Sequence, residues 1–397
     1  MPETANAPAY DLAIIGGGIY GALTLLHAVN RGWRCCLIER DKLGSATTAN
    51  NFRTLHGGLR SLQAADLPRF FEGVSQRRWF LQHFPERTSI KRFVLPLSGR
   101  SIYRPWLMRL AGLLNDSLSL HRNQGVHESH LIPKTHLLSR AELTATTPEL
   151  SMADAVGAFC WYDGQVDDLP GLMADVLQLS RSSPGSADVF EDSNVIAIDT
   201  VNQGYELTYH AAEVAQQPTS NPLTPQSVHA QRVVDTSGLW PAPWKAGLGF
   251  SPRYAPSLAW NVIFERPAIG NDAIAFRTSQ GQIVFLRPWD GRIYAGTGHA
   301  PSTEPFSDMS DIRKQILPHI PKFVGELARA SGLALSMDEV ASVQCGVLPV
   351  NSTGSTQLAT RPAFSVDDKG TALHVTGVKF TTAPGVTAQT IQRLARA

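Results

Sequence analysis

Two short glycine-containing motifs near the start of the chain carry residue types that can bind a phosphate or move a proton. Gly16, Gly18 and Gly21 have the spacing G-x-G-x-x-G. In a turn of this kind the first glycine permits the tight bend and the second lets a pyrophosphate approach the backbone. The third lets the following helix pack on its strand. Further along, residues 56–60 read His-Gly-Gly-Leu-Arg, which places a titratable ring and a cation beside two permissive glycines. The first motif predicts a dinucleotide site, and the second predicts a polar segment that returns to the same ligand.

The segments around the three glycines have the order strand, turn, helix, strand. Residues 12–15 are a short apolar run ending at glycine, which is typical of a buried parallel strand. Residues 22–31 follow as a helix whose N-terminal amides would face the phosphates. Residues 34–38 are the next predicted strand, and Glu39 stands at its end, where a carboxylate accepts from ribose hydroxyls. NAD and FAD both use this arrangement, so it leaves the cofactor open.

The segment after Glu39 favours FAD. An NAD enzyme usually continues with regularly alternating helices and strands, whereas residues 44–51 are rich in short hydroxyl and amide side chains. Such a run suits a loop that contacts a second length of ligand. The candidate cofactor contacts here are Arg40, Thr47, Thr48 and Asn50.

Two later segments are also candidates for contact with the dinucleotide. Residues 233–240 are a strand ending in small residues, of which Ser237 and Gly238 can lie against the ligand. Residues 374–385 are a strand ending at glycine and then a helix opening near residue 383, whose dipole can stabilise negative charge on a reduced flavin. The candidate contacts in this last segment are Gly377, Lys379, Phe380 and Thr381.

With these motifs in place, the sequence resembles the FAD-dependent glycerol-3-phosphate dehydrogenases, members of the wider D-amino-acid-oxidase-like flavoproteins. HGGLR is close to a family signature, and the resemblance covers nearly the whole chain. The pieces that follow in family order are HFPERTSIKRFVLPL, RPWLMRLAGLLNDSL, WYDGQVDD, VVDTSGLWP, GRIYAGTG, ATRPA and GVKFTTAPG. Because the chain ends soon after the last of them, we expect a short form without the C-terminal domain of the long bacterial dehydrogenases.

The resemblance implies a mixed α/β (α+β) fold. We expect a Rossmann-like FAD-binding domain of the glutathione-reductase type, interleaved with an antiparallel-sheet substrate domain. The predicted FAD-binding domain comprises residues 1–62, 150–250 and 350–397. The predicted substrate domain comprises residues 63–149 and 251–349, with a tight hairpin turn at Asp290-Gly291. Residues 216–226, rich in Pro, Thr, Ser and Asn, are predicted to be a surface loop.

The resemblance also implies the reacting groups. In alcohol oxidation the substrate C–H leaves as hydride to flavin N5 while a base takes the hydroxyl proton. His56 is expected to accept that proton or orient the hydroxyl, and Arg60 and Lys379 to hold an anionic or alkoxide oxygen. Arg361 is expected to hold the far anionic group, since guanidinium binds phosphate or carboxylate in bidentate geometry. We predict noncovalent FAD, although His56 and Cys345 are conceivable anchors, and no metal site.

The chain departs from the family at two positions where the family contacts its substrate. Leu348 stands where the family has an arginine in a G-V-R-P-L segment, and Ser61 stands where a tyrosine usually follows HGGLR. A leucine makes the pocket more apolar and favours a substrate with a single anionic end or a larger apolar part. Glycerol 3-phosphate itself is therefore less favoured.

Three functions remain open at this point. The first is oxidation of a secondary alcohol, such as a glycerol-3-phosphate-like compound or a 2-hydroxy acid. The second, in the same fold, is an amine or D-amino-acid dehydrogenase or oxidase. The third is a non-catalytic flavin-binding partner protein, which the presence of His56, Arg60 and Lys379 disfavours. The electron acceptor could be O₂, a quinone or another redox protein.

The net charge and the composition limit which binding partners and which cellular compartment we expect. A net charge of +1 provides no electrostatic case for nucleic acid. The 4 cysteines predict buried thiols in a reducing cytoplasm, and neither a signal peptide nor a spanning apolar run is visible. Residues 104–118 predict a basic amphipathic helix. It could contact the inner membrane surface, as the matching segment does in related membrane-bound dehydrogenases, or pack on its own protein or a second subunit.

Overall fold

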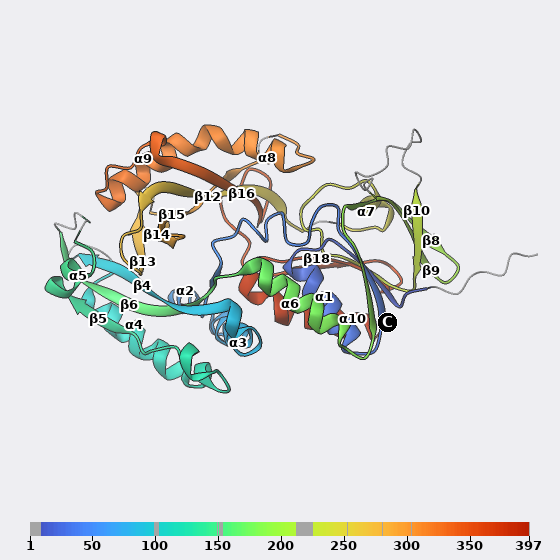
Figure 1. Ribbon diagram of the computed structural model, residues 1–397, viewed down its shortest axis with the longest axis horizontal. Coiled ribbons are helices and arrows are strands. Elements are labelled where there is room, and N and C mark those ends of the chain that lie inside the picture. The colour runs from blue at the N-terminus through green and yellow to red at the C-terminus, as the bar shows by residue number, and fades with distance from the viewer. Residues whose placement is uncertain are drawn as a thin grey trace, which may run out of the picture.

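The computed structural model describes residues 9–98, 103–148, 150, 154–211, 225–251, 253–279, 281–302 and 304–396. Most of the predicted surface loop, residues 216–224, lies outside them. Over the described residues, the strands form sheets of six, three and nine strands. Figure 1 shows two lobes, one around the six-stranded sheet and one around the nine-stranded sheet. The predicted mixed α/β fold is confirmed.

The six-stranded sheet has β1 near its centre. Its strands in spatial order are β17 (Ala363–Val366), β18 (Ala372–Thr376), β11 (Val233–Asp235), β1 (Leu12–Ile15), β2 (Arg34–Ile38) and β7 (Ser186–Phe190). Pairing is parallel except between β17 and β18. Because β2 follows β1 on one side and β11 lies on the other, a crevice opens at the carboxyl end of β1, the usual ligand position in such sheets.

Different layers cover the two faces of this sheet. Leu12 and Ile14 face helices α1 (Ile19–Val29) and α10 (Ala383–Leu394), and α6 (Leu169–Arg181) lies beside α1 (Figure 1). Ala13 and Ile15 face the three-stranded sheet and α7 (Trp244–Gly247). The strands of that sheet are β8 (Ser193–Val201), β9 (Gly204–Ala211) and β10 (Gln226–Ala230). This alternation follows from the two-residue side-chain period of a strand.

The same period separates Cys35 and Cys36, which enter the clusters on opposite faces of the sheet. All four cysteines are free and buried, as the sequence predicts. Burial raises the pKa of the Cys35 thiol to about 12, which keeps it protonated and unreactive.

The nine-stranded sheet forms the second lobe. Its strands in order are β16 (Val340–Val350), β12 (Ala255–Pro267), β15 (Arg292–Pro301), β14 (Ile283–Trp289), β13 (Ala273–Arg277), β4 (Thr88–Ser98), β6 (Ala155–Val166) and β3 (Thr54–Leu55), with β5 (His136–Ser139) also paired to β6. Among the described strands of this sheet, β13 and β4 are the one pair that runs parallel. The predicted turn at Asp290 and Gly291 joins β14 to β15, with φ angles of 47° and 73°. Positive φ at both residues is the two-residue hairpin geometry.

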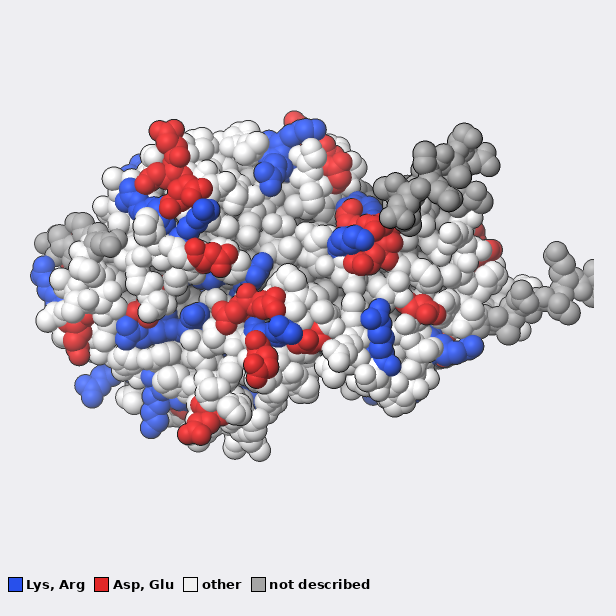
Figure 2. All heavy atoms as spheres, viewed as in Figure 1, with Lys and Arg blue, Asp and Glu red and all other residues white. Residues whose placement is uncertain are grey.

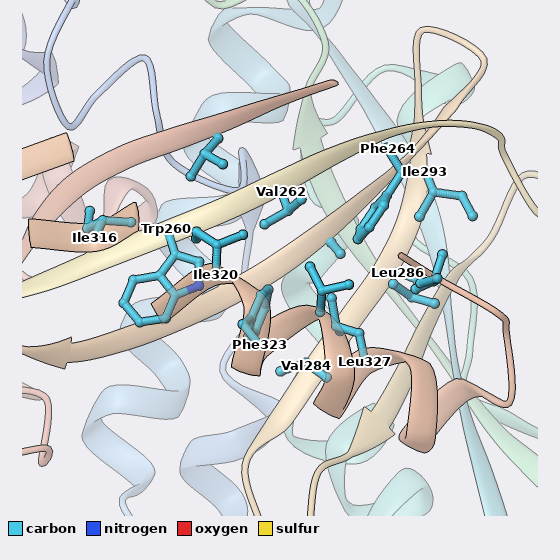
Figure 3. Close-up of a cluster of buried hydrophobic side chains, with 14 of the residues drawn as sticks. Trp260, Val262, Phe264, Val284, Leu286, Ile293, Ile316, Ile320, Phe323 and Leu327 are labelled. Carbon is cyan, nitrogen blue, oxygen red and sulfur yellow. The ribbon is translucent and has the colours of Figure 1, made fainter. Parts of the chain in front are cut away.

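A hydrophobic core lies between this sheet and the helices α8 (Met309–Ile316) and α9 (Ile320–Ser331). Trp260, Val262 and Phe264 of β12 point toward Ile320 and Phe323 (Figure 3). On the opposite face, Asn261 of β12 donates a hydrogen bond to the Asn50 carbonyl and Gly346 of β16 lies against Thr47, both in the loop that follows β2 of the first lobe. Because alternate side chains of these strands are used in the hydrophobic core, the side chains between them are the ones available to a ligand on the other face of the sheet.

Two predicted domain boundaries differ from the strand pairing. The sequence assigned residues up to 62 and from 150 onward to the FAD-binding domain, but β3 and β6 belong to the nine-stranded sheet. β6 pairs with β4 over almost its full length, and this pairing holds it in the second lobe. Helices α4 (Pro105–Leu118) and α5 (Arg140–Thr146) pack on β6, whereas α3 (Leu67–His83), which contacts α2 (Leu59–Gln63), packs against both lobes.

Charged side chains of both signs lie side by side on the face shown in Figure 2. This mixing agrees with the near-neutral net charge of +1. Within the described part of the chain, no helix is both long enough and apolar enough to cross a bilayer.

Candidate functional site

A cavity of about 260 Å³ runs along the carboxyl end of β1. It is bounded by the glycine turn, the loop after β2, the loop after β11 and the segment after β18. The predicted cofactor residues that line it are Gly16, Gly18, Glu39, Arg40, Thr47, Thr48, Ser237, Gly238, Gly377, Lys379 and Phe380. Leu348, from β16, lines it as well. Segments from the beginning, middle and end of the chain thus meet around one extended cavity.

The glycines at this cavity occupy positions where a side chain does not fit. Gly16 has a φ of +94°, and a Cβ there would lie 2.7 Å from Cα of Ser237. A Cβ on Gly21 would lie 1.8 Å from the carbonyl oxygen of Gly16. Gly21 therefore does not line the cavity but lets α1 pack against the turn. Bare backbone at the start of α1, followed by a long cleft with both apolar and polar lining, fits the pyrophosphate and the flavin half of FAD.

The loop over residues 44–51 is fixed to both lobes. Thr48 Oγ1 accepts a hydrogen bond from the Ile19 amide at 3.1 Å, and Thr47 Oγ1 accepts one from the Val347 amide at 3.2 Å. Asn50 does not line the cavity: its side chain donates to the Ala46 carbonyl. Its own carbonyl accepts a hydrogen bond from Asn261 of β12. The predicted contact between Asn50 and the cofactor has no support from this geometry, and its visible role is to join the loop to the sheet.

Glu39 stands at the end of β2, as predicted. Its carboxylate accepts hydrogen bonds from the Gly17 amide at 2.5 Å and the Asp41 amide at 2.8 Å. Burial raises the pKa of this carboxyl above its usual value. The next residue, Arg40, lies over the ring of Trp240 at 4.9 Å and also lines the cavity.

A smaller pocket of about 20 Å³ adjoins the cavity. His56 and Thr381 line it, and Lys379 lines both spaces. Burial lowers the pKa of the Lys379 ammonium, and the charges of Arg69 and Arg60 lower it further. No hydrogen bond or ion pair to Nζ of Lys379 is seen among the described residues. Two predicted catalytic residues therefore meet where the cofactor cavity ends.

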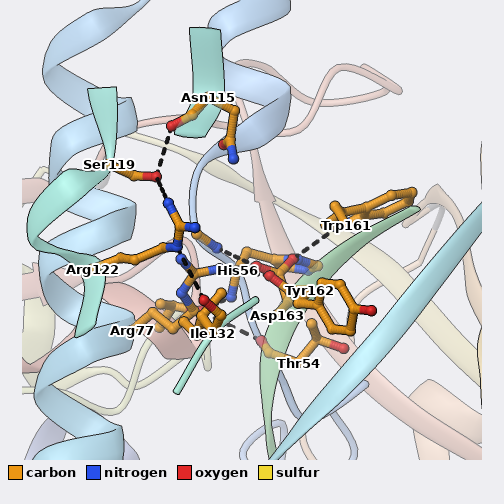
Figure 4. A network of polar contacts seen from close by, with 12 residues as sticks. Thr54, His56, Arg77, Asn115, Ser119, Arg122, Ile132, Trp161, Tyr162 and Asp163 are labelled. Atoms are coloured by element: carbon orange, nitrogen blue, oxygen red, sulfur yellow. Dashed lines mark hydrogen bonds and ion pairs between the residues drawn. The ribbon is translucent and has the colours of Figure 1, made fainter. Parts of the chain in front are cut away.

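His56 is held by a buried polar network (Figure 4). Its Nδ1 lies 3.3 Å from Oδ2 of Asp163, a residue of β6 with 4% of its surface exposed. Asp163 also accepts from the Gly57 amide at 2.7 Å and from Nη1 of Arg77 at 2.5 Å. Burial opposes the charge on Asp163, but the His56 hydrogen bond and the Arg77 charge outweigh it and lower the pKa of this carboxyl. Asp163 is therefore an ionised acceptor beneath the histidine ring.

The two glycines after His56 are explained by this network. A Cβ on Gly57 would lie 2.1 Å from Nη1 of the buried Arg77. Gly58 has a φ of +87°, and a Cβ there would lie 2.8 Å from the carbonyl oxygen of Phe70. Both glycines permit the close approach of α3 beneath His56.

Three other predicted residues line neither space. Arg361 pairs with Asp66, with Nη2 3.0 Å from Oδ2, and its neighbours Thr360 and Pro362 line the small pocket. Arg60 is exposed on α2. Ser61 is 3% exposed, and its amide donates to the Gly58 carbonyl. The structure therefore does not bring Ser61 to the substrate, because its side chain faces inward where α2 packs on α3.

Sequence reasoning missed several residues at the site. Asp163 and Arg77 hold His56, and Asp66 and Arg69 lie beside Arg361. Tyr20 donates to the Lys379 carbonyl at 2.6 Å and supports the backbone of that segment. A lone carboxylate within the apolar run of β6 is the one local signal that could have indicated Asp163.

The predicted amphipathic helix, α4, turns its apolar side outward. Met108 and Gly112 face the protein, where a Cβ on Gly112 would lie 3.0 Å from the Phe159 ring. The most exposed apolar side chains are Trp106 at 63%, Leu110 at 57% and Leu113 at 59%, with Leu120 just beyond the helix at 76%. Of the alternatives that the sequence left open for this helix, packing of the apolar side on its own protein does not hold for these residues.

Comparison with known proteins identifies the relatives of this fold and cleft. A family model described as "DAO: FAD dependent oxidoreductase" matches residues 11–393. The mitochondrial glycerol-3-phosphate dehydrogenase of Mus musculus is 24% identical over 401 residues, which cover 95% of this chain and 51% of that protein. The chain thus spans about half the length of the curated relatives it matches.

Solved structures show the same fold. Glycerol-3-phosphate dehydrogenase from Bacillus halodurans, complexed with FAD, aligns with a TM-score of 0.68 and 17% identity. The alignment covers 98% of this chain and 64% of that one. Glycine oxidase from Geobacillus kaustophilus aligns with a TM-score of 0.62 and 19% identity, covering 98% and 95%.

Proposed function

The chain belongs to the DAO family of FAD-dependent oxidoreductases, and from that premise we propose that it oxidises the secondary alcohol of a small anionic substrate by hydride transfer to flavin N5. The substrate class comprises glycerol-3-phosphate-like compounds and 2-hydroxy acids. The observation that carries the proposal is the His56–Asp163 pair: His56 lines a pocket directly beside the cavity that fits FAD, and the buried Asp163 holds its Nδ1 side. Bound FAD supplies the hydride acceptor.

His56 is proposed to accept the hydroxyl proton at Nε2. An ionised Asp163 favours the tautomer with its proton on Nδ1, which leaves the Nε2 lone pair for the substrate. Lys379 would stabilise the oxygen as it loses that proton, because its ammonium lies at the junction of the two spaces. Arg361 would hold the anionic end, and Arg60 would add positive charge near Lys379.

The cofactor cavity supports noncovalent binding. Cys345, one conceivable covalent anchor, belongs to the core cluster between β16 and the helices α8 and α9. Cys345 does not line the cavity, whereas Val347, Leu348 and Pro349 further along β16 do. Gly16, Gly18, Glu39, Thr47, Thr48, Ser237 and Gly238 would hold the dinucleotide, with Gly377, Phe380 and Thr381 beside the flavin ring.

Oxidation of an amine or D-amino acid is the second candidate. The carboxyl of Glu72 lines the small pocket and could face a substrate ammonium. Glycine oxidase also shares the fold. Against this, oxidation of a hydroxyl group requires a base that removes its proton, whereas oxidation of a neutral amine does not. A histidine held by a buried carboxylate can serve as that base.

Anaerobic reduction of the bound flavin tests the two candidates. The FAD-loaded protein is mixed with glycerol 3-phosphate, lactate, 2-hydroxyglutarate, glycine or D-alanine, and bleaching of the flavin absorption band is followed. Bleaching by a hydroxy compound, with no bleaching by the amino compounds, supports the proposal. Bleaching by amino compounds alone would overturn it in favour of the second candidate, and a colourless protein that binds NAD would overturn both.

We also propose a cytoplasmic protein that contacts the inner membrane surface through α4. The exposed apolar residues of this helix, with Arg104 and Arg109 beside them, form an amphipathic surface suited to a bilayer boundary. A quinone acceptor would reach the protein from that side, whereas O₂ or a redox protein needs no such contact. A second subunit covering the same helix is the alternative, and oligomeric state in solution separates the two.

A further inference from the structure

Asp66 lies between two arginines at the start of α3. Its side chain caps the helix by accepting from the Arg69 amide at 3.2 Å. Nη2 of Arg361 lies 3.0 Å and 3.3 Å from its two oxygens, and Nη1 of Arg69 lies 3.7 Å from Oδ2. One carboxylate is thus shared by two guanidinium groups that reach it from different segments of the chain.

Both arginines belong to the surroundings of the small pocket. Arg69 lines it, and Arg361 stands between the lining residues Thr360 and Pro362. Burial raises the pKa of the Glu72 carboxyl in this pocket, and the charges of Lys379, Arg361 and Arg69 act in the opposite direction. The charges of Lys379, Arg361 and Arg69 therefore act on the same small pocket that His56 lines. The side chain of Arg361 is 60% exposed, so a ligand entering from solvent can reach it.

Leu348 extends from β16 into the cofactor cavity. A substrate with its reacting carbon between His56 and the flavin would meet an aliphatic side chain there and guanidinium groups toward α3. Its anionic end is therefore directed toward Arg69 and Arg361.

We propose that Asp66 is an internal counter-ion in an anion subsite formed by Arg361 and Arg69, and that it selects a singly charged carboxylate over a doubly charged phosphate. This inference rests on the proposed function and narrows its substrate class to 2-hydroxy acids. Two guanidinium groups and one carboxylate carry a single net positive charge. A bound carboxylate balances that charge, whereas a phosphate group, at about −1.5 to −2 near neutral pH, overbalances it and is repelled by Asp66.

The negative charge of Asp66 can be removed by substitutions that still cap α3. Asn and Ser are as favourable as Asp at the first position of a helix, so Asp66→Asn and Asp66→Ser keep the hydrogen bond to the Arg69 amide. Both variants leave the two arginines in the subsite with no carboxylate between them.

The test measures binding of two simple anions to the oxidised, FAD-loaded protein. Inorganic phosphate or acetate is titrated in, and the dissociation constant is read from perturbation of the flavin absorption bands. Asp66→Asn should tighten phosphate binding about tenfold and acetate binding only about threefold, because the doubly charged ion gains more when a negative neighbour is removed. Asp168→Asn is the matched control: Asp168 caps α6 and pairs with Arg87 at 2.8 Å but lines neither pocket. It should change neither constant.

Two outcomes of the titration itself would overturn the proposal. One is unchanged or weaker phosphate binding in both Asp66→Asn and Asp66→Ser with FAD retained. The other is the same tightening in an Arg361→Gln, Arg69→Gln background, where no subsite remains. Loss of FAD from both single variants would assign Asp66 a structural role and also reject the proposal. Because the titration involves no turnover, it stands even if no hydroxy compound reduces the flavin.

Discussion

His56 turns its Nδ1 toward the buried carboxylate of Asp163, with 3.3 Å between the two atoms (Figure 4). Leu55 of β3 pairs with Gly164 of the antiparallel strand β6. His56, the residue after Leu55, therefore lies beside Asp163, the residue before Gly164. Arg77 completes the arrangement from α3. A short strand pair therefore sets the orientation of the proposed base.

Replacing Asp163 by Asn should slow flavin reduction while FAD stays bound. The amide cannot stabilise the Nδ1–H tautomer or the cation formed when His56 takes a proton. We expect a fall of about 10² in the rate of reduction at saturating substrate, the lower end of what a positioned base contributes. Stopped-flow measurement of flavin bleaching checks this. In a His56→Asn background the same change should cost less than about threefold, because the two residues act as a unit. Fully additive losses would contradict the role of Asp163.

Gly57→Ala should disturb the same pair through packing. The added methyl group would meet Nη1 of Arg77, which is buried and paired with Asp163, so the ion pair must shift. We expect a loss of about 2 kcal/mol or more in unfolding free energy and a fall in the rate of flavin reduction. Gly325→Ala in α9 is the control, since a Cβ there meets nothing within 4 Å. It should be neutral or stabilising by up to about 1 kcal/mol.

Arg361→Ala should weaken apparent substrate binding more than it slows the reaction. The guanidinium is proposed to hold the anionic end, remote from the reacting carbon, so its loss removes binding that is equal in the ground and transition states. We expect KM to rise about 10- to 100-fold with kcat within about threefold. Steady-state kinetics with the substrate that bleaches the flavin provide the measurement. An unchanged KM would show that Arg361 serves only as the partner of Asp66.

Asp235→Asn should destabilise the FAD-binding lobe in a pH-dependent way. Burial opposes the charge on Asp235, but the Lys245 ammonium and hydrogen bonds from His374 and Ser237 outweigh it and lower the pKa of this carboxyl to about 2. A depressed pKa contributes stability above the unfolded value near 4, and that stability is lost as pH falls toward about 2. The wild type should exceed the variant by about 2 kcal/mol at pH 7 and by progressively less below about pH 4.

Denaturant unfolding at pH 7 and at about pH 3 checks that difference. Asp308→Asn is the control, because Asp308 caps α8 by accepting from Ser310 and Asp311 amides and Asn caps equally well. A difference between wild type and Asp235→Asn that stays constant with pH would refute the assignment to an ionised carboxylate.

The exposed side of α4 predicts binding to vesicles. Trp106→Ser with Leu113→Ser should reduce co-sedimentation with anionic lipid vesicles by about tenfold or more, since two large apolar side chains lose their burial. Leu317→Ser, at a site that is 50% exposed between α8 and α9, should not change it. If wild type does not sediment with vesicles and instead forms a dimer that the double variant abolishes, the helix is a subunit contact.

Local sequence determined the strand–turn–helix unit that fits the cofactor. The glycine spacing, the apolar runs on either side of it and Glu39 lie within one strand–helix–strand unit, whose geometry depends on neighbours a few residues away. The hairpin at Asp290 and Gly291 is local in the same way. Short-range backbone preferences decide such features, so the sequence predicts them well.

Only the tertiary structure decided what surrounds the substrate. Asp163 reaches His56 across 107 residues, and Asp66 reaches Arg361 across 295. Both contacts depend on strand register and on the packing of α3 against the C-terminal segment. The inward turn of Ser61, where α2 packs on α3, and the outward turn of the apolar side of α4, which packs on β6 and β5, are also set by tertiary contacts. The sequence alone determined a flavin site, because its motif is local. The charges that meet the substrate come from distant segments, so their arrangement required the fold.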